Sequence, residues 1–257
     1  MFSEATAIRP IGPGRYQATA DSTWFQGPGA YGGWSGAVLL RAMQAEVGPR
    51  PARTFTAQYA TTVAAGDAAI EVAVERTGAT TAFASARLVQ DGVRVHAIAT
   101  FGEDRSRDFD EDRERPPAAP PASAVPAIPF RPPAPVFLQQ FRVHLIEGFP
   151  YSGAERSGVR AWIRSAEVEP VDAPLALGLL DVLPPAILPR ATSLRPMSTL
   201  VWHVHLLADL PGDGTEPWLV DVESRITRAG FSDQETRLFR PSGELVGYGR
   251  QLVAVIR

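Results

Sequence analysis

The chain has 257 residues, of which 45% are hydrophobic and 21% charged, so it can bury a large core and is not dominated by disorder. It contains neither cysteine nor lysine, which excludes disulfides, thiolate ligands, a cysteine nucleophile, a Schiff-base lysine and a P-loop lysine. The net charge is −3 and the arginines are scattered among acids, so no nucleic acid partner is expected. No segment has the apolar length of a membrane span or the pattern of a signal peptide, and we expect a soluble, cytoplasmic protein.

The first half of the chain predicts one helix followed by strands. The segment GGWSGAVLLRAMQA, over 32–45, is apolar at helical spacing. Alternating or β-branched segments then predict four strands, over 52–63, 68–78, 82–90 and 93–101. Asp91-Gly92, between the last two of these segments, is a hairpin signal.

A proline-rich stretch divides the chain. Nine prolines lie between positions 116 and 135, and the charged run DRSRDFDEDRER precedes them. Such a composition predicts an extended, semi-rigid linker over 106–135. It separates an N-terminal half, 1–105, from a C-terminal half, 136–257.

The second half repeats the order of the first. A helix is predicted over 173–183, and strands over 199–207, 217–227, 235–240 and 244–256, with a turn ending at Gly243. The dipeptide Val-Glu precedes a phenylalanine at the same interval in both halves, and Arg-Leu also recurs, at an offset of about 150 residues. This duplication predicts an α+β protein with antiparallel strands and one central helix in each half.

Two polar residues stand out in apolar surroundings. Asp181 ends the stretch LALGLLD, where a buried carboxylate needs partners and where the end of a helix is electrostatically unfavourable for it. Gln251 shares a strand face with small and apolar residues. Both side chains are therefore candidates for a functional site, although a capping aspartate and a core glutamine are the structural alternatives.

Several segments together resemble the TesB-like acyl-CoA thioesterases, which have a double-hotdog fold. The segments are AYGGWSGAVLLRAM, VERTGATTAFASARLVQDG, VRAWIR, LGLLDVLPPA and GFSDQETRLFRPSGELVGYGRQLVAV. The resemblance covers nearly the whole chain except the linker. It implies a tandem hotdog, in which two antiparallel sheets each wrap a central helix and together form one continuous surface. It also implies hydrolysis of acyl-CoA to free acid and CoA, as in fatty acid metabolism, with no cofactor and no metal.

The resemblance also suggests the residues that hold the attacking water. In these thioesterases an aspartate, a hydroxyl residue and a glutamine do so, and the matching motifs place Asp181 and Gln251 at two of those positions. Counting back from His205 places the family threonine at Met197, and Thr199, on the same strand face, is the nearest hydroxyl residue that fits. The Met197 position supports the alternative function, a non-catalytic protein that binds acyl thioesters.

The start of the first helix is the candidate site for the thioester oxygen. Free backbone N–H groups at Gly32, Gly33 and Trp34 would stabilise the developing oxyanion at the positive end of that helix. The glycines over 27–32 also match a dinucleotide-binding pattern, but Pro28 removes an N–H and hairpins follow. A nucleotide site is therefore not expected.

Other motifs are weaker. Asp91 and His96 have the spacing of hotdog hydratases without the surrounding motif, so they are interpreted as turn and strand residues. His203 and His205 share a strand face and could bind a metal, but no third ligand is evident, so no metal site is predicted. Association into a homo-oligomer, such as a dimer through the backs of the sheets, stays open.

Overall fold

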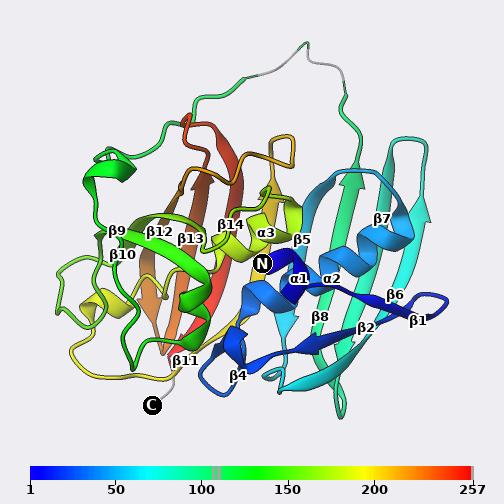
Figure 1. The fold of residues 1–257 in the computed structure, drawn as a ribbon, viewed down its shortest axis with the longest axis horizontal. Helices are drawn as coiled ribbons and strands as arrows, with labels where there is room; N and C mark the ends of the chain where they lie inside the picture. The colour runs from blue at the N-terminus through cyan, green and yellow to red at the C-terminus, as the bar shows by residue number, and fades with distance from the viewer. Residues whose placement is uncertain (106–107, 109–110, 256–257) are drawn as a thin grey trace.

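The computed structural model describes residues 1–105, 108 and 111–255, and its largest element is one antiparallel sheet (Figure 1). In the described chain this sheet has twelve strands in the order β1-β2-β6-β7-β8-β5-β11-β14-β13-β12-β10-β9. The strands of the first half are β1 (Arg9–Gly12), β2 (Arg15–Ala20), β5 (Ala52–Tyr59), β6 (Gly66–Thr77), β7 (Thr81–Val89) and β8 (Val93–Gly102). Those of the second half are β9 (Phe141–Glu147), β10 (Gly158–Ser165), β11 (Met197–Leu206), β12 (Trp218–Arg228), β13 (Phe231–Phe239) and β14 (Leu245–Val255).

The two halves meet at the pair β5 and β11. Residues Thr54–Gln58 of β5 lie opposite Val201–His205 of β11, and the strand order is mirrored on either side of this pair. The prediction of two sheets that form one surface is thus met by a single hydrogen-bonded sheet, with no interruption between the halves.

Two helices, α2 (Gly32–Val47) and α3 (Ala173–Leu180), pack on one face of the sheet and against each other (Figure 1). Every residue of α3 and ten residues of α2 are buried, as expected for central helices that are apolar on most sides. A Cβ built on Gly33 would lie 3.0 Å from Cα of Gly178. The small residues at this crossing therefore bring the start of α2 close to the C-terminal part of α3.

Most predicted elements are present. The helices over 32–45 and 173–183 correspond to α2 and α3, and the eight predicted strands correspond to β5–β8 and β11–β14. Asp91, with φ of 44°, and Gly92, with φ of 105°, form the predicted turn, because left-handed backbone favours glycine and aspartate. The outer strands β1, β2, β9 and β10 were not predicted, nor were the short helix α1 (Phe2–Ala5) and the small pair β3 (Phe25–Gln26) and β4 (Gly29–Ala30).

The proline-rich segment lies along the outer strands of the second half. The carbonyl groups of Ala118, Pro120 and Val125 accept hydrogen bonds from Arg160, Trp162 and His144, respectively. These three donors belong to β9 and β10. Residues 106, 107, 109 and 110 of the predicted linker, and residues 256–257 of the predicted C-terminal half, lie outside the described residues.

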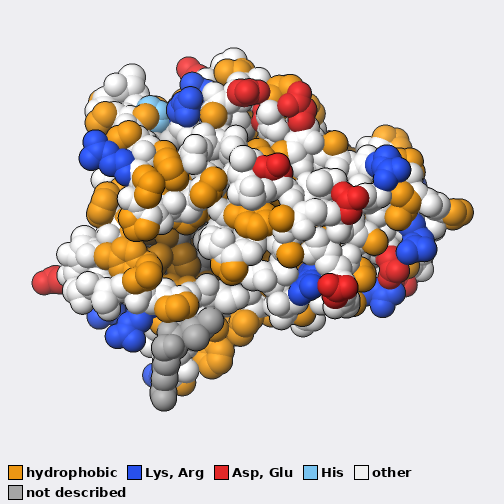
Figure 2. Space-filling model, turned by 60° about the horizontal axis from the view of Figure 1, so that its bottom comes forward, with side chains coloured by type: hydrophobic (Ala, Val, Ile, Leu, Met, Phe, Trp, Pro, Cys, Tyr) orange, Lys and Arg blue, Asp and Glu red, His pale blue; other side chains and the backbone are white. Residues whose placement is uncertain are grey.

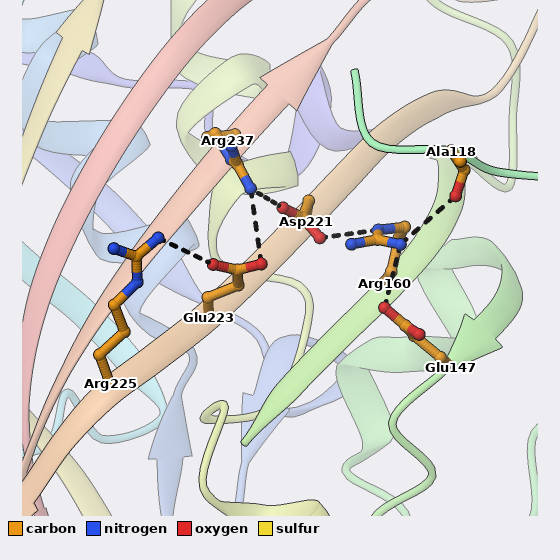
Figure 3. Close-up of polar contacts among 7 residues, drawn as sticks. All are labelled: Ala118, Glu147, Arg160, Asp221, Glu223, Arg225 and Arg237. Atoms are coloured by element: carbon orange, nitrogen blue, oxygen red, sulfur yellow. Dashed lines mark hydrogen bonds and ion pairs between the residues drawn. The ribbon is translucent and has the colours of Figure 1, made fainter. Parts of the chain in front are cut away.

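A group of ion pairs lies close to this segment (Figure 3). The Asp221 side chain, on β12, is only 2% exposed and accepts hydrogen bonds from Arg160 at 2.7 Å and Arg237 at 2.5 Å. Arg160 also pairs with Glu147, and Arg237 with Glu223. Acid and base thus alternate across β9, β10, β12 and β13 without an unpaired charge at the centre.

None of the helices in the described part of the chain has the length and apolar character needed to cross a membrane.

Candidate active site

Asp181 joins the two halves of the molecule. It is the first residue after α3 and is half-buried. Its Oδ2 accepts a hydrogen bond of 2.7 Å from the N–H of Gly33, and its Oδ1 accepts one of 2.7 Å from Nε2 of Gln251. The structure therefore brings together three of the predicted site residues, Asp181, Gly33 and Gln251. In the sequence, Gly33 lies 148 positions and Gln251 70 positions from Asp181.

The position of Asp181 explains how a carboxylate is tolerated there. The C-terminal end of its own helix disfavours negative charge, but the N-terminal end of α2 favours it. Gly33 provides an N–H of that end that has no acceptor within the helix and donates to Asp181. Burial raises the pKa of Asp181 to about 6, while the hydrogen bonds from Gln251 and Gly33 oppose the increase. The group is thus mostly ionised at neutral pH, yet more basic than an ordinary aspartate.

Gly32 permits the close approach of this carboxylate. A Cβ at position 32 would lie 2.7 Å from Oδ2 of Asp181 and 3.3 Å from the hydroxyl oxygen of Tyr59. The Tyr59 hydroxyl donates a hydrogen bond of 3.1 Å to the carbonyl of Gly32. Tyr59 was not among the predicted site residues, because its place at the end of β5 carries no sequence signal for contact with the start of α2.

Behind Gln251 lies a second buried amide, that of Gln234 on β13. Gln234 donates from Nε2 to Oε1 of Gln251 at 2.5 Å, and its own Oε1 accepts from the N–H of Ala186 at 3.0 Å. Gln234 was not among the residues predicted from the sequence. The available signal was its place in β13, where alternate residues from Ser232 onward are buried.

Thr199 lies near this group without joining it. It pairs across the sheet with Val253, two residues beyond Gln251 on β14, so both side chains lie on the same face. Among the hydrogen bonds between described residues, none links the Thr199 hydroxyl to Asp181 or Gln251. Its role stays a prediction. Met197, at the position of the family threonine, is the first residue of β11 and pairs with Val255.

The three predicted N–H donors at the start of α2 differ in availability. The N–H of Gly33 is bonded to Asp181, and that of Trp34 donates to the carbonyl of Tyr31 at 3.1 Å. For Gly32, no acceptor is found among the described residues. The Gly32 N–H is thus the donor of this set that is free for a ligand.

His203 and His205 lie on the face of the sheet opposite to that of Gln251. The Nε2 atoms of His203 and His205 are 2.8 Å apart, and Nδ1 of His203 is 2.6 Å from the hydroxyl oxygen of Thr56. They alternate along β11 with the buried Trp202 and Val204 and therefore face the other side of the sheet. In the described part of the chain, no three histidine or acidic side chains have an arrangement suited to a metal ion.

Family models match both halves of the chain. The model of the acyl-CoA thioesterase N-terminal domain matches residues 20–102, and that of the acyl-CoA thioesterase C-terminal domain matches residues 112–255. A search of curated protein sequences found no match.

Solved structures with the same fold cover nearly the whole chain. A hotdog-fold protein from Alicyclobacillus acidocaldarius has a TM-score of 0.93 and 24% identity over 100% of this chain and 98% of its own. The TesB protein of Mycobacterium avium subsp. paratuberculosis has a TM-score of 0.84 and 16% identity, over 100% and 98%. The acyl-CoA thioesterase II TesB2 of Mycobacterium marinum has a TM-score of 0.80 and 18% identity, over 99% and 98%. These likenesses show a hotdog fold with a large antiparallel sheet.

Proposed function

The chain belongs to the acyl-CoA thioesterase family and is an acyl-CoA thioesterase, and we propose that Asp181 is the general base that activates water for attack on the thioester. The proposal rests on the hydrogen bonds that the Asp181 carboxylate accepts. Its carboxylate accepts one strong hydrogen bond at each oxygen, from Gly33 and Gln251, in a half-buried place where desolvation raises its pKa to about 6. A base whose pKa lies near the working pH is well suited to proton transfer.

The hydrogen-bonding capacity of these groups leaves room for a water molecule. An ionised carboxylate offers about four lone-pair positions, and two of those of Asp181 are used by the protein. The Nε2 of Gln251 has a second N–H that can hold the water oxygen. Thr199, on the same sheet face, is proposed as the third group that orients the water.

In the proposed reaction, Asp181 accepts a proton from water as the water oxygen attacks the thioester carbonyl carbon. The carbonyl oxygen becomes negative and is stabilised by the free N–H of Gly32 and by the positive end of α2. The tetrahedral intermediate then breaks its C–S bond, and the CoA sulfur leaves with the proton held by Asp181. The products are the free acid and CoA, and the chain needs no covalent acyl intermediate for these steps.

We also propose that the fold is a tandem hotdog, with halves over 1–105 and 136–257 and a linker over 106–135. The mirrored strand order about β5 and β11, and the presence of one central helix in each half, support this division.

The proposed base is tested by Asp181→Asn, with release of free thiol measured over a panel of acyl-CoA chain lengths. We expect turnover to fall by about 10² or more, which is the usual contribution of a general base, while acyl-CoA binding persists. In the wild type, kcat/KM should rise with pH through about 6, because the base acts in its deprotonated form.

Glu216→Gln, at an exposed residue, is the matched control and should leave turnover unchanged. An Asp181→Asn protein as active as the wild type would refute the proposal. A wild-type protein that binds acyl-CoA and releases no thiol would instead establish the non-catalytic alternative.

A further inference from the structure

The orientation of one side-chain amide matters for the proposed base. The oxygen and nitrogen of a glutamine amide have nearly the same shape but opposite hydrogen-bonding character. Gln251 helps Asp181 only when Nε2 faces the carboxylate; if it turned by 180°, its oxygen would face Oδ1. A turned amide would accept a hydrogen bond from a protonated Asp181 and would thereby favour the inactive form of the base.

The structure contains a chain of hydrogen bonds with one permitted direction. It starts at the backbone N–H of Ala186, which can only donate, and which bonds Oε1 of Gln234 at 3.0 Å. Nε2 of Gln234 must then face Gln251, whose Oε1 it reaches at 2.5 Å. Gln251 is left with Nε2 toward Asp181, at 2.7 Å. A backbone group thus determines which end of the Gln251 amide meets the carboxylate.

Burial keeps this chain intact. Gln234 is 3% exposed and Gln251 4% exposed, so water cannot readily replace a lost partner. The two residues lie directly opposite each other on β13 and β14. Ala186 follows Asp181 by five positions, and Pro184 and Pro185 between them provide no N–H that could compete as the donor.

We propose that Gln234 is a positioning residue that holds the Gln251 amide in the direction that keeps Asp181 ionised. This inference rests on the proposed role of Asp181 as the base. Gln234 acts through Gln251, since the structure gives it no direct hydrogen bond to the Asp181 carboxylate.

Two tyrosines near Asp181 stay uncharged in the relevant pH range. Tyr59 faces it from the end of β5, and Tyr31 from the residue before α2. Burial and the negative charge of Asp181 raise the pKa of both tyrosines well above their usual value, so both stay neutral near pH 6. The charge of Glu169 also contributes to the raised pKa of Tyr31, and this residue is common to all the variants below.

The test compares Gln234→Met with the wild type, by titrating the Asp181 carboxyl with ¹³C NMR and by measuring kcat/KM against pH. Methionine fills a similar volume but does not orient the amide. Because Gln251 can then turn when Asp181 is protonated, we expect the Asp181 pKa to rise by about one unit and the acid limb of kcat/KM to move with it. In a Gln251→Ala background the same substitution should produce almost no shift, since no amide is left to orient.

The control is Thr236→Val, which removes a polar group equally buried on the same face of β13, and which should leave the titration unchanged. Gln234→Leu, which is also uncharged and apolar, is the second variant if the methionine protein does not fold. It likewise leaves the Gln251 amide without a fixed direction and should give the same rise in the Asp181 pKa.

An unchanged Asp181 titration in Gln234→Met, or an equal shift in the Gln251→Ala background, would overturn the role of Gln234. These outcomes are separate from a failure of the proposed function. If Asp181→Asn stays active, the base assignment is wrong whatever Gln234 does. If Asp181→Asn is inactive and the titration does not respond to Gln234, only the positioning role is lost.

Discussion

At the scale of single residues, the site depends on residue 32 being glycine, which has no side chain. Gly32 lies between the Asp181 carboxylate and the Tyr59 hydroxyl, and both are closer than an ordinary van der Waals contact to the place of a Cβ. The same residue provides the N–H proposed to stabilise the oxyanion and the carbonyl that binds Tyr59. Its backbone has an ordinary conformation, so close approach, and not a positive φ, is the reason for glycine.

We therefore expect Gly32→Ala to impair catalysis more than folding. The added methyl group must displace the carboxylate or the first turn of α2, since 2.7 Å to Oδ2 is too short for a carbon atom. A fall of about tenfold or more in kcat is expected, because small displacements of a catalytic group are costly. The measurement is thiol release at saturating acyl-CoA together with the urea midpoint. Gly12→Ala, where no atom lies within 4 Å of the new Cβ, should change neither, and a fully active Gly32→Ala protein would contradict this account.

At the scale of elements, the duplicated strands differ in how they bury the same kind of charge pair. Asp221 on β12 faces Arg237 on β13, and at the equivalent place of the first half Glu71 on β6 faces Arg87 on β7. The first acid is 2% exposed and the second 36%. Both acids have a second arginine on the next strand, Arg160 for Asp221 at 2.7 Å and Arg15 for Glu71 at 4.0 Å. The difference follows from the cover over Arg160, whose guanidinium bonds the Ala118 carbonyl of the proline-rich segment (Figure 3) and is 13% exposed, against 57% for Arg15.

This contrast predicts unequal effects of neutralising the two acids. Asp221→Asn should lower the free energy of unfolding by about 2 to 3 kcal/mol, because two partly buried guanidinium groups lose their shared anion. Glu71→Gln should cost less than about 1 kcal/mol, as for exposed ion pairs. Urea unfolding of both variants measures the difference directly. Equal losses would show that burial does not determine the strength of these pairs.

At the scale of the whole molecule, the halves are held together without the linker. The β5–β11 pairing, the α2–α3 contact and the hydrogen bond from Gly33 to Asp181 all cross between them.

Figure 2 shows that the surface is mixed, with hydrophobic groups gathered around a hollow on one side. Charged groups are distributed over the rest of that view.

A protein with a cut linker should therefore remain one active complex of two fragments. We expect a protein cleaved at a protease site introduced between Arg113 and Glu114 to elute as a complex of both fragments and to retain most of its thioesterase activity. Gel filtration followed by a thiol-release assay provides the measurement, with the uncut protein as the control. Fragments that separate under native conditions would show that the linker, and not the shared sheet, holds the halves together.

The sequence by itself determined the helices, the inner strands and the duplication, because alternation and helical spacing are local consequences of which side of an element is buried. It also singled out Asp181 and Gln251, as polar residues in apolar segments that match a family pattern. The outer strands escaped prediction. β1 is four residues long and wholly exposed, so it has no buried face to record, whereas β10 alternates between half-buried and buried residues and was missed although that signal was present.

Only the tertiary structure decided which groups gather around Asp181. The Gly33 N–H, the Tyr59 hydroxyl and the Gln234 amide reach the site through strand register and through the crossing of α2 with α3. Local pattern tells which face a residue occupies, but not which distant donor lies opposite it. The direction of the Gln251 amide is the clearest case, because it depends on a backbone N–H 65 positions away at Ala186, relayed through Gln234 on the neighbouring strand β13.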